Sequence, residues 1–176
     1  MSESRVYIRK VQGTDKKELL EIAQSGRAFH DPWISPPLTS HIFKLYLRRT
    51  QRDDHEGLLL CSKADHGIVG VLNINTIVRG SFLSASLGYY VAREHTGKGY
   101  MREGVELIKT YAFEDLGLHR IEANIQPDNE RSINLVKSCG FAYEGVSKQF
   151  LFINGRWRDH QRWAAFDPRT TLARSP

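Results

Sequence analysis

The residues with the clearest chemical potential form a glycine-containing loop over 93–101, Arg-Glu-His-Thr-Gly-Lys-Gly-Tyr-Met. It joins an apolar segment ending at Val91, expected to be a strand, to an amphipathic segment that is expected to be a helix. The first amides of a helix have no partner within the helix and carry the positive end of its dipole. Gly97 and Gly99 would let a ligand approach that backbone closely. The loop therefore predicts a site for phosphate or pyrophosphate.

Three phosphate-binding designs fit this loop in part, and a plain glycine turn is the fourth possibility. A dinucleotide fingerprint needs a third glycine, where this chain has Arg102, and its loop would not follow a block of antiparallel strands. A P-loop needs Ser or Thr directly after its lysine, but Lys98 is followed by Gly99. The third design is the pyrophosphate loop of coenzyme A acyltransferases. The loop residues alone leave this design and the plain turn open.

The elements that must position the loop follow from the hydropathy pattern. A strand is expected over 5–11, and Asp15 with Glu18 forms a capping-box-like start for the first helix. Further strands are expected at 58–62, 68–74, 82–92, 121–125, 141–153 and 157–166, and helices at about 39–52, 100–116 and 129–139. Asp65-His66-Gly67 and Asn154-Gly155 favour hairpin turns. The pattern predicts an α/β (α+β) fold in a single domain over 1–176, with a central mixed, mostly antiparallel sheet flanked by helices.

The composition limits the class of protein further. The 176 residues are 40% hydrophobic and 26% charged, and no apolar run approaches the ~20 residues that span a bilayer. The first residues carry charges where a signal peptide is apolar, so a cytoplasmic protein without membrane contact is expected. The two cysteines, Cys61 and Cys139, are expected to be buried free thiols. The net charge of +5 fits either a solvated basic face or attraction to a phosphorylated cofactor or nearby RNA. No specific nucleic-acid binding is expected.

Several short segments carry a family resemblance through their order and spacing. They are IVRGSF (77–82), LGY (87–89), GKGYM (97–101), HRIEAN (119–124), PDNERS (127–132), GF (140–141), EG (144–145) and INGRWRDH (153–160), with DPW (31–33) upstream. Together they make the segment 68–166 resemble the GNAT acetyltransferases. Within that family the resemblance is to the Rim-type enzymes that acetylate ribosomal-protein N-termini, and most to the type acting on an N-terminal alanine of a small-subunit ribosomal protein.

The resemblance implies a sheet splayed at an acyl-CoA site and transfer of an acetyl group from acetyl-CoA, a co-substrate, without a metal. It places the cofactor on Val91, Thr96, Gly97, Lys98, Gly99, Tyr100, Met101, Asn129 and Ser132. The implied acceptor is the N-terminal α-amine of a ribosomal or other protein. A small-molecule amine, a lysine side chain, or a non-catalytic acyl-CoA-binding module are the alternatives.

Departures from the family pattern leave the general base open. Val136 stands where many members have a tyrosine that protonates the leaving thiolate, and Asn124 and Leu151 stand where other branches have acidic residues. Ser132 is therefore the candidate proton donor, with a first-turn serine that bonds the backbone as the alternative. Glu122 shares a strand face with Asn124 and is a candidate base, with a solvated or salt-bridged glutamate as the alternative.

Acceptor-side candidates lie in two segments. The proline-rich stretch 29–37 cannot be regular helix, and its His30 and Asp31 could bind the acceptor amine beside Trp33. Tyr89 and Tyr90 end the strand that leads to the glycine loop. Because side chains alternate along a strand, one tyrosine is expected in the cleft and the other in the packed interior.

Overall fold

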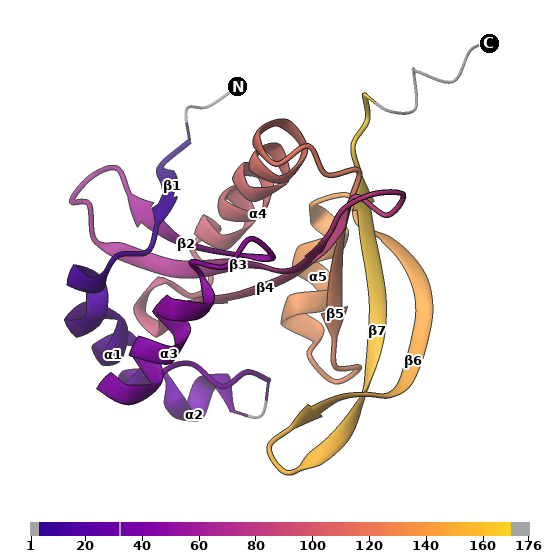
Figure 1. Ribbon diagram of the computed structural model, residues 1–176. Helices are drawn as coiled ribbons and strands as arrows, with labels where there is room; N and C mark the ends of the chain where they lie inside the picture. Colours follow the sequence, from indigo (N-terminus) through magenta and orange to yellow (C-terminus); the bar gives the residue numbers. More distant parts are fainter. Residues whose placement is uncertain (1–3, 32, 170–176) are drawn as a thin grey trace.

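The computed structural model describes residues 4–31 and 33–169 and contains one seven-stranded sheet with the order β1-β2-β3-β4-β5-β7-β6 (Figure 1). Neighbouring strands run antiparallel except β4 and β5, which are parallel. The expected fold class, a mixed and mostly antiparallel sheet with flanking helices, is thereby confirmed. The strands are β1 (Val6–Lys10), β2 (His55–Ser62), β3 (Ile68–Val78), β4 (Ser84–Val91), β5 (Arg120–Ile125), β6 (Ala142–Ile153) and β7 (Arg156–Phe166).

Helices cover both faces of the sheet, and alternation along the strands explains why. In β2, Leu58 and Leu60 pack into one core with α4 and α5, whereas Leu59 and Cys61 pack into a second core with α1 and α3. A strand that is buried on both faces reads as a continuous apolar run, as this one does. The helices are α1 (Lys16–Ser25), α2 (Arg27–His30), α3 (Ser40–Arg49), α4 (Tyr100–Thr110) and α5 (Glu130–Ser138).

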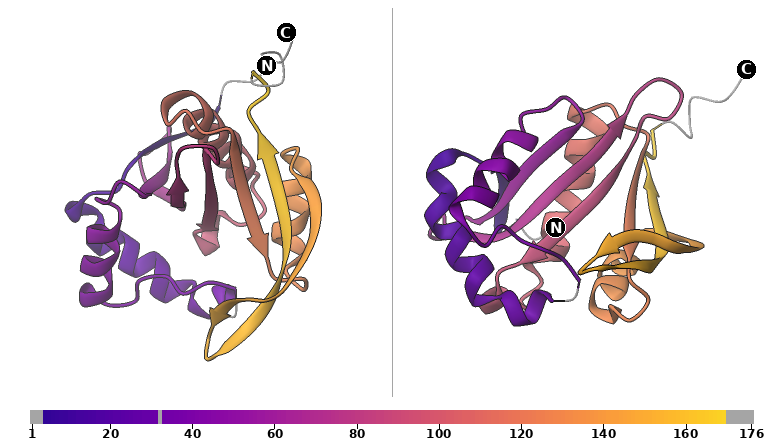
Figure 2. Two further views of the ribbon diagram at one scale, coloured as in Figure 1. Left: turned by 45° about the vertical axis from the view of Figure 1, so that its right-hand side comes forward. Right: turned by 60° about the horizontal axis from the view of Figure 1, so that its bottom comes forward.

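The sheet opens between its two parallel strands. β4 and β5 pair only from Ser84 with Arg120 to Ser86 with Glu122, while β3 stays paired with β4 as far as Val91. The two views of Figure 2 show β1–β4 turning away from β5, β7 and β6 below this point. The end of β4 therefore has one edge without a neighbouring strand, as the expected splay requires.

One local expectation is wrong. Asp15 does not cap α1: its carboxylate accepts from the backbone N–H of Gln12 at 2.7 Å and binds Arg9, so it fixes the preceding 3-10 turn. Glu18 accepts instead from the backbone N–H of Ile68 at 2.6 Å and ties α1 to β3. The helix expected over 100–116 is present: α4 ends at Thr110 and continues as one π-helical turn, Tyr111–Asp115.

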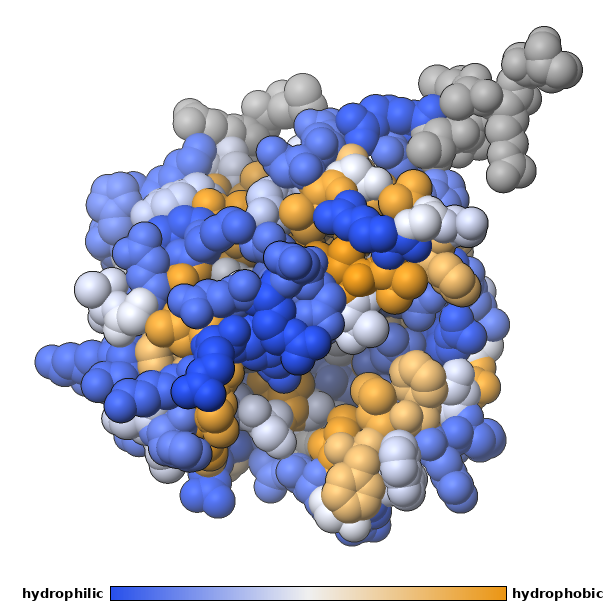
Figure 3. Space-filling view, in the orientation of Figure 1, coloured by the Kyte–Doolittle hydropathy of each residue, from blue (hydrophilic) through white to orange (hydrophobic). Residues whose placement is uncertain are grey.

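The hairpin of β6 and β7 projects from the sheet. Asn154 and Gly155 both have positive φ, 49° and 79°, the turn geometry that the sequence Asn-Gly favours. Exposed apolar side chains gather over this hairpin at the lower right of Figure 3, among them Phe152 and Trp157. Within the described ranges, no helix is long and apolar enough to cross a membrane.

Candidate active site

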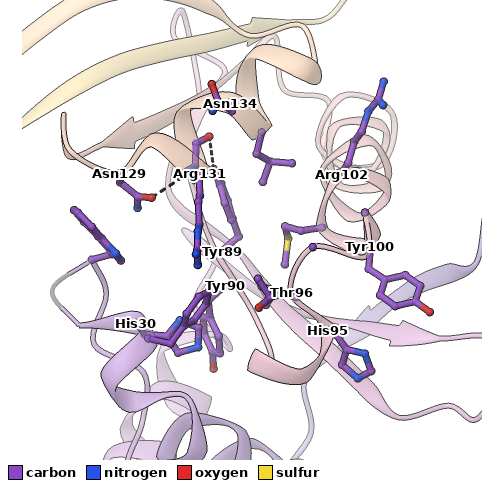
Figure 4. Close-up of a pocket in the computed structure, with 18 of the residues that line it drawn as sticks. His30, Tyr89, Tyr90, His95, Thr96, Tyr100, Arg102, Asn129, Arg131 and Asn134 are labelled. Carbon is purple, nitrogen blue, oxygen red and sulfur yellow. Dashed lines mark hydrogen bonds between the residues drawn. The ribbon is translucent and has the colours of Figure 1, made fainter.

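The main pocket lies where the sheet opens, between the glycine loop, α5 and the segment around α2 (Figure 4). Its volume is about 690 Å³. The described residues that line it include Phe29, His30, Trp33, Tyr89, Tyr90, Val91, His95, Thr96, Gly97, Gly99, Tyr100, Met101, Arg102, Asn129, Arg131, Ser132, Asn134, Leu135 and Ser138. The pocket thus brings together most of the residues that the sequence predicted for a cofactor and an acceptor.

The glycine loop has the backbone shape of a ligand cradle. Gly97 and Gly99 have φ values of 77° and 80°, which residues with a Cβ rarely adopt, and Gly99 is the N-cap of α4. A Cβ at Gly97 would meet no atom within 4 Å, so the space above this residue is open. Thr96 Oγ1 is buried and has no hydrogen-bond partner. Open amides at a helix start and an unpaired buried hydroxyl favour an anionic ligand.

Arg5 fixes this loop from outside. Its guanidinium donates to the backbone carbonyl of Lys98 at 2.9 Å and forms an ion pair with Glu103 on α4 at 2.5 Å. The same guanidinium lies over the ring of Tyr100, 4.5 Å from its centroid. The Lys98 carbonyl is therefore held by Arg5. The backbone N–H groups of Thr96 and Lys98 donate within the loop, to Arg93 O at 3.2 Å and to His95 O at 3.5 Å, so the amides around Gly97 and Gly99 are the candidates for binding a ligand.

The unpaired edge of β4 supplies further backbone groups. The N–H of Ala92 donates to Val69 O on β3 at 2.8 Å. Because amide directions alternate along an antiparallel strand, the backbone groups of Val91 and Tyr89 point away from β3, into the opening beside β5. An extended amide-containing arm can pair with such an edge, and an N–H there can bind a developing oxyanion.

Hydroxyl groups meet at the start of α5. Asn129 caps the helix, since its Oδ1 accepts from the backbone N–H of Ser132 at 3.2 Å. The hydroxyls of Ser132 and Tyr89 are 2.5 Å apart. Burial raises the pKa of Tyr89, so its phenol stays protonated at neutral pH and can donate. A protonated hydroxyl pair of this kind can supply a proton to a thiolate.

The acceptor side of the pocket is aromatic and apolar. His30 is buried edge-on between Phe29 and Tyr90, with ring centroids 5.1 and 5.2 Å away, and burial lowers its pKa. Beyond it a groove of about 340 Å³ continues between α3 and β4. Its described lining consists of Ile34, Ser35, Pro36, Pro37, Ile42, Leu45, Tyr46, Arg49, Asn73, Gly88, Tyr89 and Tyr90.

Three of the expected site residues do not line the main pocket. Lys98 contributes its carbonyl to Arg5, and Asp31 Oδ1 accepts from Asn154 Nδ2 of the β6–β7 turn at 2.8 Å. Glu122 forms ion pairs with Arg120 and Arg162 at 2.8 and 3.5 Å. Their assigned roles stay predictions.

The expectation that only one of the two tyrosines faces the cleft is wrong. Tyr89 and Tyr90 leave opposite faces of β4, yet both line the pocket. The reason is that no strand pairs with this edge of β4 beyond Ser86. Side chains from both faces of β4 can therefore reach the cavity beside that edge.

Sequence reasoning missed two basic residues of the lining, Arg102 and Arg131. Arg102 lies in the first turn of α4, next to the predicted phosphate site, and this position was an available signal. Arg131 extends from α5 toward the side of the pocket where His30 and Tyr90 lie, and its guanidinium is 5.2 Å from the ring centroid of Phe29 (Figure 4). That contact joins segments far apart in the chain, so sequence spacing gives no sign of it.

These features fit the parts of acetyl-CoA. The loop amides, Thr96 Oγ1 and Arg102 suit the phosphates, the open edge of β4 suits the amide-containing pantetheine arm, and the hydroxyls of Ser132 and Tyr89 suit the sulfur.

Comparison with known proteins agrees with this assignment. The profile of the family described as Acetyltransferase (GNAT) domain matches residues 5–142. The [ribosomal protein uS5]-alanine N-acetyltransferase of Escherichia coli is 32% identical over 182 residues, covering 99% of this chain and 94% of that protein. The chain belongs to the GNAT acetyltransferase family, and its reaction is acyl-CoA-dependent acetyl transfer.

Two further relatives include one that is named for a different acceptor, spermidine. RimJ of Mycobacterium smegmatis, solved in complex with CoA-disulfide, superposes with a TM-score of 0.83 at 27% identity, covering 93% of this chain and 83% of that one. A spermidine N(1)-acetyltransferase of Vibrio cholerae is 36% identical over 96 residues, 54% of this chain and 53% of that protein. Family membership therefore leaves the acceptor to be argued from the site.

Proposed function

We propose that this enzyme transfers the acetyl group of acetyl-CoA to the N-terminal α-amine of a protein, with a ribosomal protein as the leading candidate. The observation that carries the proposal is the charge of the acceptor side. None of the described residues lining the main pocket, the groove beyond it or the small cavity between β4 and β5 is an aspartate or glutamate. The charged side chains there are Arg102, Arg131 and Arg49.

A polyamine would be a poor match for this lining. Spermidine carries several positive charges at neutral pH, and each buried charge needs an opposite partner. Asp31, the nearest acidic residue along the α2 segment, is instead hydrogen-bonded to Asn154. A peptide N-terminus carries one positive charge, followed by a neutral chain that can lie along the groove of Ile42, Leu45 and Tyr46.

The chemistry of the amine supports the same choice. The unperturbed pKa of an α-amine is about 7.7–8.0, against about 10.4 for lysine. An appreciable fraction of the α-amine is therefore neutral at pH 7, and a weak base suffices to deprotonate the rest. The described lining contains histidines but no carboxylate, which suits an α-amine better than a lysine. The E. coli relative named for alanine acetylation of uS5 adds support.

A comparison of the two acceptor classes tests the proposal. The enzyme and acetyl-CoA would be incubated in one reaction with a short peptide that has a free N-terminal alanine, and in a separate reaction with spermidine. The products of both reactions would be measured by mass spectrometry. We expect kcat/KM for the peptide to exceed that for spermidine by at least tenfold. A higher kcat/KM for spermidine would contradict the proposal.

A designed variant sharpens this comparison. Leu45→Glu places a carboxylate on the exposed wall of the groove, where Leu45 is 48% exposed and the change should leave the fold intact. This variant should gain activity toward spermidine. The exposed Glu21→Gln change on α1, outside the groove, is the matched control and should alter neither substrate.

A further inference from the structure

A second, smaller cavity of about 90 Å³ fills the opening between β4 and β5. It shares Tyr89, Asn129 and Ser132 with the main pocket and is also lined by Asn124 of β5 and His160 of β7. With a share of about 30 Å³ per water molecule, the cavity has room for a few waters or a small terminal group. It therefore adjoins the place where the reacting sulfur and carbonyl are expected.

The tautomer of His160 follows from one hydrogen bond. Its Nδ1 lies 3.0 Å from the backbone carbonyl of Arg158, and a carbonyl can only accept, so Nδ1 carries the proton. In the neutral imidazole, Nε2 then presents a lone pair. The side chain is 2% exposed, and burial is the main cause that lowers its pKa. His160 is thus held as a neutral, oriented proton acceptor.

A second acceptor faces the same cavity. The side-chain Nδ2 of Asn124 is 3.4 Å from Ser86 Oγ, and its Oδ1 is buried without a hydrogen-bond partner. Two acceptors in a small cavity match an ammonium group, which has only donors. A buried acceptor without a partner also needs an explanation, and a bound amine provides one.

The other candidate bases are less well placed. Glu122 is engaged by Arg120 and Arg162. His30 directs Nε2 toward Gly26, because a Cβ built there would lie 2.8 Å from that atom. Of the described side chains lining the small cavity, His160 alone is of a type whose ordinary pKa lies near neutral pH.

Burial lowers the pKa of His160, and the charge of Asp159 acts in the opposite direction. Asp159 is its neighbour in sequence, and the Asp159 carboxylate forms an ion pair with Lys148 of β6 at 2.7 Å. On the side of β6 the ring of Phe150 packs against the imidazole, with centroids 6.0 Å apart. From β5 and the following turn, the neutral Asn124 and Gln126 face the cavity.

We infer that His160 is the general base of this acetyltransferase and that Asn124 holds the acceptor amine beside it. One proton of the ammonium passes to His160 Nε2 and on to solvent, and the neutral nitrogen attacks the thioester carbon. As the C–S bond breaks, the nitrogen gives its second proton to the hydroxyl pair of Ser132 and Tyr89, and that pair passes one proton to the thiolate, so both hydroxyls end as they began. The products are the amide, the free thiol of CoA and one proton released to solvent.

The test is His160→Asn, which keeps the bond to Arg158 and removes the base. Asparagine Nδ2 can occupy the place of imidazole Nδ1 and donate to the same carbonyl, whereas nothing replaces Nε2. We expect kcat to fall about 100-fold, as loss of a positioned base does. The KM for acetyl-CoA should change less than twofold. His41→Asn, on the exposed face of α3 outside the cavities, is the matched control and should retain wild-type kcat.

A second readout separates a proton role from a packing role. His160→Ala should lose activity and regain part of it, at least tenfold, when imidazole is added, because free imidazole can enter the vacated space and take the proton. No recovery with imidazole, or kcat of His160→Asn within twofold of wild type, would overturn the inference. This inference rests on the proposed acetyltransferase activity but concerns the proton step for whichever amine the enzyme accepts. The wild-type enzyme would therefore first be measured with the peptide and with spermidine, and the His160 variants would then be measured with the better acceptor. A wrong acceptor assignment would show in the first measurement, and a wrong role for His160 would show only in the second.

Discussion

The phenol of Tyr89 at the open edge of β4 lies 2.5 Å from the hydroxyl of Ser132 in the first turn of α5. This pair bridges the opening of the sheet at the point where the sulfur of acetyl-CoA is expected. Val136, at the position where the family resemblance leads us to expect a tyrosine, is fully buried and offers no proton. In the proposed mechanism, this contact gives a tyrosine hydroxyl a route to the leaving group through a serine.

Removing the serine should slow the chemical step. Ser132→Ala deletes the hydroxyl next to the sulfur, and we expect kcat to fall about 100-fold with little change in the KM for acetyl-CoA. Tyr89→Phe should produce a similar loss, and the double variant should be no slower than the single ones, because the two hydroxyls act in one chain. Steady-state kinetics measures all three; multiplicative losses would show that the hydroxyls act independently.

The glycine loop should be sensitive to a side chain for a reason other than strain. Gly97 and Gly80 both have positive φ, 77° and 68°, and at both an added Cβ meets no atom within 4 Å. Valine at either position is strained, but only Gly97→Val enters the cofactor site. Calorimetry should show acetyl-CoA binding weakened at least tenfold in Gly97→Val and unchanged in Gly80→Val. Equal affinities for acetyl-CoA in the two folded variants would contradict the assignment of this loop to the cofactor site.

The ion pair between β5 and β6 predicts a pH dependence of stability. Arg120 donates to both carboxylate oxygens of Glu144 and holds the pKa of that carboxyl below its usual range. A lowered folded-state pKa stabilises the protein above the unfolded pKa of about 4.3, and this stabilisation is lost as pH falls through the folded pKa.

Glu144→Gln should consequently destabilise the protein at pH 7, by no more than about 1 kcal/mol because the pair is partly exposed. The difference from wild type should shrink below about pH 4. Urea denaturation across this pH range measures it, with Glu21→Gln, an exposed α1 residue, as the control. A difference that stays constant down to pH 3 would mean that the pair does not contribute through its charge.

The sequence predicted most of the elements and the glycine loop that lines the main pocket, because both depend on local signals. Continuous apolar runs give β2 and the first half of β3, Asn-Gly gives the turn between β6 and β7, and glycines before a helix start give the loop that lines the main pocket. The resemblance placed Asn129 and Ser132 at one helix start, and the structure has them there beside the pocket.

Contacts made in three dimensions could not be predicted in the same way. The Tyr89–Ser132 contact spans 43 residues, and Asp31 meets Asn154 across 123 residues. His160 belongs to a strand whose alternating pattern says only that one face is buried, and whether that face meets a cavity depends on where β4 leaves β5. For the same reason Tyr89 and Tyr90 could not both be assigned to the pocket from alternation alone.

Acetyl transfer to a matched pair of peptides tests the central claim most directly. One peptide has a free N-terminal alanine and no lysine, and the other has the same residues with a blocked N-terminus and one internal lysine. Mass spectrometry after incubation with acetyl-CoA should show acetylation of the first peptide at least tenfold faster than of the second, with a rate that rises with pH through the titration of the α-amine. Faster acetylation of the blocked, lysine-containing peptide would contradict the account, and acetylation of neither would transfer the acceptor assignment to a small-molecule amine.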